Sequence, residues 1–104
     1  MPIPHYHEGS DETVYGLSGM ITWLVDGQEV VVGPGQSAFI PRGVVHGFSN
    51  RSGEAARFLS ILTPGRLGPA YFQETADLVN SGHATHEAMV ALMTRYGLIP
   101  SAAV

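Results

Sequence analysis

Two histidines near the start of the chain, His5 and His7, have the residue type and spacing to bind one metal ion together. Alternate side chains of a strand point to the same face, so an extended segment directs both imidazoles to one point. Neutral imidazoles are common ligands of transition metals. Glu12 follows after a short turn, and His46 comes much later in the chain. A barrel can bring such distant segments together, which makes these four residues candidate metal ligands.

Other groups of the same chemistry compete for this role. Glu8 and Asp11 are carboxylates close to Glu12 in the sequence. Glu8 directly follows the histidine pair, so a continuing strand would point it away from the imidazoles. His83 and His86 are three residues apart, whereas a helical zinc pair is separated by four. We interpret these two histidines as surface or helix-capping residues.

The elements that must position the candidate ligands can be read from turns and apolar runs. Up to about Gly68, glycine and proline separate short segments rich in Val, Ile, Phe, Tyr and Thr, which is typical of an all-β sandwich or barrel. Asp26-Gly27 between two apolar runs indicates a tight hairpin. We predict strands near residues 3–7, 12–18, 20–26, 28–32, 36–40, 44–50 and 55–63.

The last third of the chain has a different pattern. Pro69 fits the first turn of a helix that runs to about Asn80, and Thr85 fits the N-cap of a second helix over 86–96. Apolar residues recur at helical spacing in the second helix and predict a stripe that packs against the barrel or a partner; they are Met89, Leu92, Met93 and Tyr96. We interpret residues 1–104 as a single domain, with a β-barrel over 1–66 and a helical extension over 67–104.

Composition narrows the classes of protein and partner. The 104 residues are 44% hydrophobic and 13% charged, which favours one packed domain. The net charge of −4 and the absence of a basic cluster give no reason to expect nucleic acid or anionic lipid as a partner. No cysteine is available for a disulfide or a thiolate metal site. The start of the chain lacks a signal-peptide pattern and no apolar run is long enough to span a bilayer, so we expect a cytoplasmic protein with no membrane contact.

The spacing of the candidate ligands relative to glycines and prolines carries a family resemblance. The first block reads His5-x-His7, four residues, Glu12, six residues, Gly19; the second reads Gly35, five residues, Pro41-x-Gly43, two residues, His46, three residues, Asn50. Both blocks are similar to the two motifs of the cupin superfamily. Further segments resemble small single-domain bacterial cupins of the quercetin-dioxygenase-like type; they are Pro4-His5-x-His7, Asp11-Glu12, Leu17-x-Gly19, Pro41-Arg42-Gly43-Val44 and Thr63-Pro64-Gly65.

This resemblance implies a jelly-roll β-barrel and a homodimer. It also implies one divalent transition-metal ion (Fe, Mn, Ni, Co, Cu or Zn) held by His5, His7, Glu12 and His46, while Asp11 is one residue away from the family position. Such cupins usually have at least one strand before the histidine pair, whereas four residues precede His5 here. Either the barrel is trimmed, or a neighbouring subunit completes an exposed sheet edge.

By the same resemblance, the chain is expected to be a metal-dependent dioxygenase of a small enol, phenol or diketone, in which Glu12 is both ligand and general base. A non-redox isomerase, cyclase, decarboxylase or lyase, and a binding protein without turnover, are the alternatives. Counting by twos from the ligands places Val14, Val44 and Phe48 on the same interior, as candidate substrate-pocket residues. Arg42 is interpreted as a solvated turn residue, with a clamp for a substrate carboxylate as the alternative.

Overall fold

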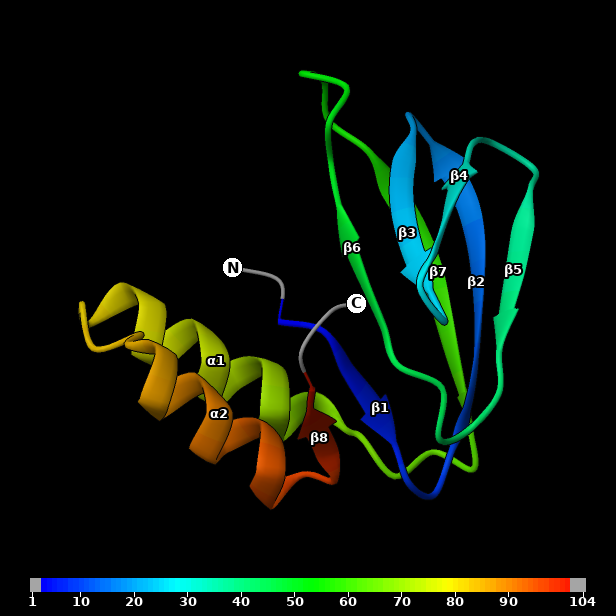
Figure 1. The fold of residues 1–104 in the computed structure, drawn as a ribbon. Helices are drawn as coiled ribbons and strands as arrows, with labels where there is room; N and C mark the ends of the chain where they lie inside the picture. Colours follow the sequence, from blue (N-terminus) through cyan, green and yellow to red (C-terminus); the bar gives the residue numbers. More distant parts are fainter. Residues whose placement is uncertain (1–2, 102–104) are drawn as a thin grey trace.

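Two antiparallel β-sheets and a helical hairpin make up the computed structural model, which describes residues 3–101 (Figure 1). The larger sheet has the strand order β4 (Gln28–Val32), β3 (Ile21–Val25), β6 (His46–Ser49), β1 (His5–His7) and β8 (Leu98–Pro100). The smaller sheet has the order β5 (Ser37–Ile40), β2 (Asp11–Ser18) and β7 (Arg57–Thr63). The hairpin consists of α1 (Pro69–Asn80) and α2 (His86–Arg95). This arrangement confirms the expected jelly-roll architecture, but as two open sheets, with no closed barrel among residues 3–101.

Local sequence explains the turns that connect the strands. Asp26 and Gly27 both adopt positive φ, 51° and 79°, at the tight turn between β3 and β4, as the Asp-Gly signal predicted. Gly19 also has a positive φ, 71°, where the chain reverses between β2 and β3. A Cβ atom at Gly19 would lie 2.6 Å from the carbonyl oxygen of Ala55, so both the backbone angle and the available space require glycine there.

A compact apolar core lies between the two sheets. Its buried members come from strands of both sheets and are Val14, Ile21, Trp23, Val32 and Ile40, each at most 6% exposed. Val14 and Ile40 lie on the smaller sheet, and the other three come from β3 and β4 of the larger sheet. The core therefore fixes the face of each sheet that points inward.

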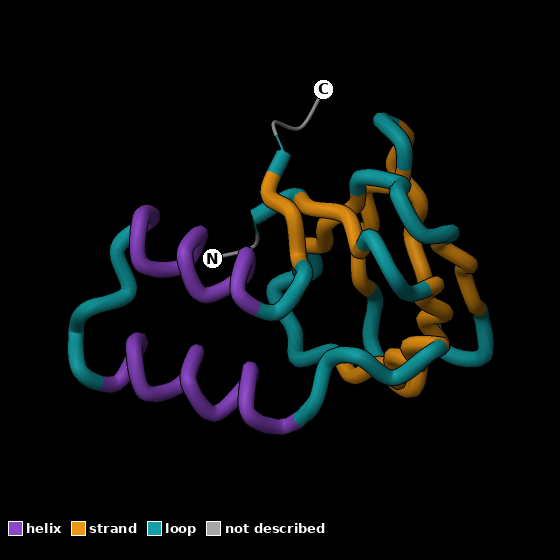
Figure 2. The backbone as a smooth tube through the Cα atoms, turned by 90° about the horizontal axis from the view of Figure 1, so that it is seen from below, coloured by secondary structure: helices purple, strands orange, loops and turns teal. Residues whose placement is uncertain are grey.

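The buried residues of the helical hairpin all lie on α2. Met89, Leu92 and Met93 of α2 are buried, whereas α1 has no buried residue. Thr85 caps α2 as predicted, because its hydroxyl accepts a hydrogen bond from the backbone N–H of Ala88. The two helices run side by side at one end of the molecule (Figure 2). Neither helix is long and apolar enough to cross a bilayer.

The chain after α2 returns to the larger sheet as β8, a strand that the sequence patterns did not predict. It pairs antiparallel with β1, with Tyr6 opposite Ile99 and His7 opposite Leu98. On its other side, β1 is in register with β6 only at His5 and His46. The strand that carries the first two histidines is therefore held mainly by the C-terminal segment.

Candidate metal centre

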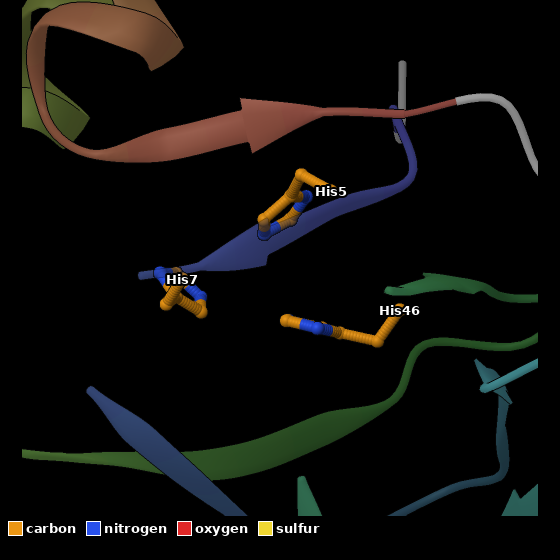
Figure 3. Close-up of side chains that lie close together, drawn as sticks. All are labelled: His5, His7 and His46. Carbon is orange, nitrogen blue, oxygen red and sulfur yellow. The ribbon is translucent and has the colours of Figure 1, made fainter. Parts of the chain in front are cut away.

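Three imidazoles meet at the larger sheet, as the sequence predicted (Figure 3). His5 and His7 share one face of β1, and His46 at the start of β6 is the cross-strand partner of His5. One ring nitrogen from each residue lies within 4.8 Å of the others. Ligands at about 2 Å from a common ion are separated by at most about 4 Å, so small side-chain adjustments suffice for one ion to bind all three.

Backbone carbonyls orient two of the rings. The Nδ1 atom of His5 lies 2.7 Å from the carbonyl oxygen of Ile3, and Nδ1 of His46 lies 3.0 Å from that of Val44. A carbonyl oxygen only accepts, so Nδ1 carries the proton in both rings. In the neutral tautomer, Nε2 then keeps a free lone pair, and this is the arrangement that metal-binding histidines usually have.

Glu12 joins the cluster from the opposite sheet. Its side chain comes from β2 and is buried, and its Oε1 atom lies 3.1 Å from Nε2 of both His7 and His46. The hydroxyl of Ser60 donates a hydrogen bond to Oε2 at 2.7 Å. The structure therefore brings Glu12 to two of the three imidazoles, and the group of mutually close ring nitrogens consists of the histidines alone.

The charges of this cluster suit a cation. Burial, together with the neighbouring imidazoles of His46 and His7, lowers the pKa of His5 to about 4 despite the opposing hydrogen bond to Ile3. Burial also disfavours the charged form of Glu12, but its close side-chain contacts with His46 and His7 and the hydrogen bond from Ser60 outweigh burial and hold the pKa of this carboxyl below its ordinary value. At neutral pH the centre thus contains a neutral His5 imidazole and an ionised carboxylate.

The contact between His46 and Glu12 tests whether these residues fit a metal. With Nδ1 protonated, the Nε2 atom of neutral His46 presents a lone pair to Oε1 of Glu12 at 3.1 Å. Two lone pairs at this distance repel unless a positive charge lies between or on them. A divalent ion supplies that charge and is suited to nitrogen and carboxylate ligands, so the donor set fits the implied metal.

The competing groups lie elsewhere. Asp11, at the start of β2, forms an ion pair with Arg42 in the turn before β6; the Nε atom of Arg42 lies 3.2 Å from Oδ1 of Asp11. This ion pair gives both residues a structural role away from the imidazoles. Glu8 is exposed beside β1. His83 and His86 are exposed around the start of α2, and His83 contacts the hydroxyl of Ser81 at 3.0 Å.

The three candidate pocket residues are placed in different surroundings. Val14 is 0% exposed in the apolar core, so it has no surface to offer a substrate in this structure. Val44 is partly buried against the same core. Phe48 is 42% exposed and its ring packs against Trp23 and Phe58, with ring centroids 5.0 and 5.2 Å away.

Ser60 is the site residue that sequence reasoning missed. It lies on β7 opposite Val14, so it faces the same side of the smaller sheet as Glu12. The signal was a polar residue within the apolar segment 58–62. Without the register between β2 and β7, that serine could not be assigned to the interior.

Comparison with known families identifies the fold. Residues 1–62 match the model of the cupin domain. The chain belongs to the cupin family. Quercetin 2,3-dioxygenase from Bacillus subtilis is 35% identical to this cupin over 75 residues, which are 72% of this chain and 22% of that enzyme. The chain spans half or less of the length of the curated relatives it matches.

Two solved structures are similar over more than half of this chain. The crystal structure of a sugar phosphate isomerase from Silicibacter pomeroyi has a TM-score of 0.54 and 34% identity, and the match covers 58% of this chain and 40% of that one. The polyketide cyclase RemF from Streptomyces resistomycificus has a TM-score of 0.51 and 34% identity, with 68% and 58% covered. These relatives share a fold and differ in their reactions.

Proposed function

We propose that this cupin is a metal-dependent dioxygenase of a small enol, phenol or diketone, with His5, His7, His46 and Glu12 as the metal ligands. The proposal rests on three imidazoles that lie close together and on a buried carboxylate that contacts two of them. The similarity to a quercetin dioxygenase supports the reaction class. A bound divalent transition-metal ion would supply Lewis acidity toward a substrate oxygen and, where redox-active, electron exchange with dioxygen.

The residues of the chain have separable tasks in this proposal. The imidazoles hold the ion, and their Nδ1 hydrogen bonds to Ile3 and Val44 keep Nε2 of His5 and His46 directed to the centre. Glu12 is ionised at neutral pH, so its carboxylate can accept the hydroxyl proton of an enol or phenol. Ser60 fixes the second carboxylate oxygen. The loss of the proton leaves an electron-rich anion, which is the form that reacts with an oxidant.

Metal analysis and oxygen uptake test this assignment. Protein purified without chelator or nickel resin should contain about one transition-metal ion per chain, and a candidate enol should cause oxygen consumption with both atoms of ¹⁸O₂ in the product. Glu12→Gln should keep part of the metal and lose turnover, because an amide cannot take up the proton. Full oxygen uptake by Glu12→Gln would exclude Glu12 as the base.

A non-redox metalloenzyme is the second candidate. The similarity to a sugar phosphate isomerase and to a polyketide cyclase favours it, because neither isomerisation nor cyclisation consumes dioxygen. The same ligands would hold an ion that stabilises an enolate, with Glu12 as the proton carrier. Turnover of an enolisable substrate without oxygen uptake, with zinc as the native metal, would favour this reaction over dioxygenation. Metal binding without any turnover would indicate a small-molecule-binding cupin.

We also propose that the chain forms a homodimer through the outer face of the smaller sheet. Large apolar side chains occupy two adjacent cross-strand rows on this face and are 42–60% exposed; they are Tyr15, Phe39, Leu59 and Ile61. Their neighbours in these rows, Thr13 and Ser37, are uncharged. These two rows carry no charge, so covering them with a second copy packed sheet on sheet buries apolar surface without desolvating an ion.

Sedimentation velocity tests the dimer. The wild-type protein should sediment as a dimer, and Phe39→Glu should sediment as a monomer with an unchanged circular dichroism spectrum. Val79→Glu, which alters an apolar residue of α1 that is 57% exposed, is the matched control and should remain dimeric. A monomeric wild type would refute the proposal.

A further inference from the structure

A cavity of about 300 Å³ lies directly beside the candidate metal centre. It forms where three segments meet: the turn from β1 to β2, the linker after β7, and the end of α2. Its lining residues are His7, Glu8, Gly9, Ser10, Arg66, Leu67, Tyr96 and Gly97. His7 belongs both to this cavity and to the imidazole cluster, so the cavity adjoins the centre where a substrate would react.

Arg66 is held against the wall of this cavity. A Cβ atom at Gly9 would lie 3.1 Å from Cδ, 3.2 Å from Nε and 3.4 Å from Cζ of Arg66. Gly9 has no positive φ, so its backbone conformation does not demand glycine. The absence of a side chain at position 9 instead leaves room for the guanidinium to lie across the turn that follows His7.

Arg66 has no ion-pair partner within the described part of the chain. Arg42, Arg51 and Arg95 each form an ion pair with a carboxylate, at 2.9–3.2 Å. Among residues 3–101, no carboxylate lies within 4.0 Å of the Arg66 guanidinium, although Glu8 lines the same cavity. Arg66 is exposed at this cavity, and an unpaired arginine that lines a cavity next to the candidate metal centre is suited to an anionic group of the ligand.

We propose that Arg66 binds a carboxylate of the substrate while the reacting enol or diketone lies at the metal centre. The inference rests on the proposed function and narrows its substrate class to enolic or diketo carboxylic acids. A guanidinium binds a carboxylate through two parallel N–H···O hydrogen bonds, which also orient the ligand. The Glu8 carboxylate in the same cavity disfavours a doubly charged phosphate, so a single carboxylate is the better match.

Two matched diketones test the assignment. 2,4-Dioxopentanoate differs from 2,4-pentanedione by a carboxylate in place of a terminal methyl group. Calorimetric titration of both into the zinc-loaded protein at pH 7 gives their ratio of dissociation constants. The wild type should bind the carboxylate compound more tightly, and Arg66→Gln should reduce this preference by about tenfold or more, as expected for a lost charge-assisted pair. Comparing ratios between variants cancels the different intrinsic metal affinities of the two diketones.

Matched controls separate this inference from the proposed function. Arg57→Gln removes an arginine that forms no ion pair with any residue of 3–101 and lies on β7 away from the cavity lining, so it should leave the ratio unchanged. Arg66→Gln should keep its zinc content and its affinity for 2,4-pentanedione. An unchanged ratio in Arg66→Gln, or an equal loss in Arg57→Gln, would overturn the role of Arg66 and leave the metal-centre proposal intact. If neither diketone bound the zinc-loaded wild type, the proposed function and this inference would both fall.

Discussion

At the scale of single residues, the candidate centre depends on hydrogen bonds made by atoms that face away from it. Carbonyls of Ile3 and Val44 engage Nδ1 of His5 and His46, and Ser60 engages the outer oxygen of Glu12. These contacts fix which lone pairs converge on the centre. Partners of this kind tune both the direction and the basicity of a ligand.

His46→Ala should lower the metal content sharply. His46 is only 2% exposed and is the histidine of the cluster that comes from β6, so removal of its ring leaves the two β1 imidazoles without their third nitrogen donor. Metal stoichiometry by mass spectrometry after extensive dialysis measures the effect. His83→Ala, which alters an exposed histidine outside the cluster, should retain the wild-type content. Equal metal content in His46→Ala and the wild type would refute the ligand assignment.

Ser60→Ala should weaken metal binding by about tenfold without removing a ligand, in the range typical of outer-shell partners. The substitution deletes the 2.7 Å hydrogen bond to Oε2 of Glu12 and leaves that oxygen free to turn from the centre. Competition with a fluorescent zinc chelator gives the affinity. Ser37→Ala, on the outer face of the same sheet, is the control. A Ser60→Ala affinity equal to that of the control would show that the hydroxyl does not orient Glu12.

Residue types and spacing predicted the three histidines and Glu12 because each carries its chemistry in its identity. Ser60 could not be found this way, since a serine in a strand has no distinctive spacing. Val14 shows another limit of sequence reasoning. The alternation of side chains along β2 correctly placed Val14 on the same face as Glu12, but only the packing of the structure shows that Val14 is fully buried in the core. The type of a residue can therefore predict a candidate ligand, whereas strand register and side-chain packing determine which residues surround it.

At the scale of elements, the three-residue strand β8 is the main pairing partner of β1, the strand that carries His5 and His7. It supplies three of the register pairs of β1, and β6 supplies one. Leu98 of β8 is 3% exposed, and α2, whose buried residues are Met89, Leu92 and Met93, packs against the same strand. The C-terminal segment therefore supports the strand that carries His5 and His7.

Leu98→Ala should lower the free energy of unfolding by about 2–5 kcal/mol, as for other buried leucines. It should also weaken metal binding, because β1 loses part of the packing that supports it. Urea unfolding and chelator competition give the two quantities. Val79→Ala on the exposed face of α1 should change stability by less than about 0.5 kcal/mol. Normal metal affinity in a destabilised Leu98→Ala variant would separate the site from β8.

The helices were predictable from local signals, since Pro69, Thr85 and the apolar spacing of α2 each act within one or two turns. The strand β8 was not, because Leu98-Ile99-Pro100 is too short to show alternation and ends in proline. Its strand conformation depends on pairing with β1, which lies more than 90 residues earlier in the chain. Long-range pairing of this kind leaves no local trace.

At the scale of the whole molecule, the candidate centre connects the two sheets. The imidazoles come from β1 and β6 of the larger sheet, and Glu12 comes from β2 of the smaller one. Among residues 3–101, no strand belongs to both sheets. The two sheets therefore meet through side chains, which are those of the apolar core and those of this polar cluster. Sequence motifs predicted the jelly-roll class, which the fold confirms, and the candidate ligands, whose role in metal binding stays a prediction. The open arrangement depends on how sheet edges pair, which short-range periodicity does not report.

An ion bound by residues of both sheets would stabilise the fold, because it binds the native state and finds no preformed site in the unfolded chain. At a free metal concentration 100 times the dissociation constant, this linkage contributes about 2.7 kcal/mol. For a domain of about 100 residues, such a gain raises Tm by roughly 10–20 °C. Chelation with EDTA should therefore lower Tm by this order, and added zinc should restore it, as measured by scanning calorimetry.

His46→Ala separates this linkage from other effects of the chelator. The variant should unfold at a similar temperature with and without EDTA, because it no longer holds the ion at the junction of the sheets. His86→Ala, which alters an exposed histidine of α2, should keep the full metal-dependent shift. A wild-type Tm that does not respond to EDTA or zinc would mean that no ion links the sheets. The carboxylate of Glu12 and the imidazoles would then have to be held together by protonated histidine alone.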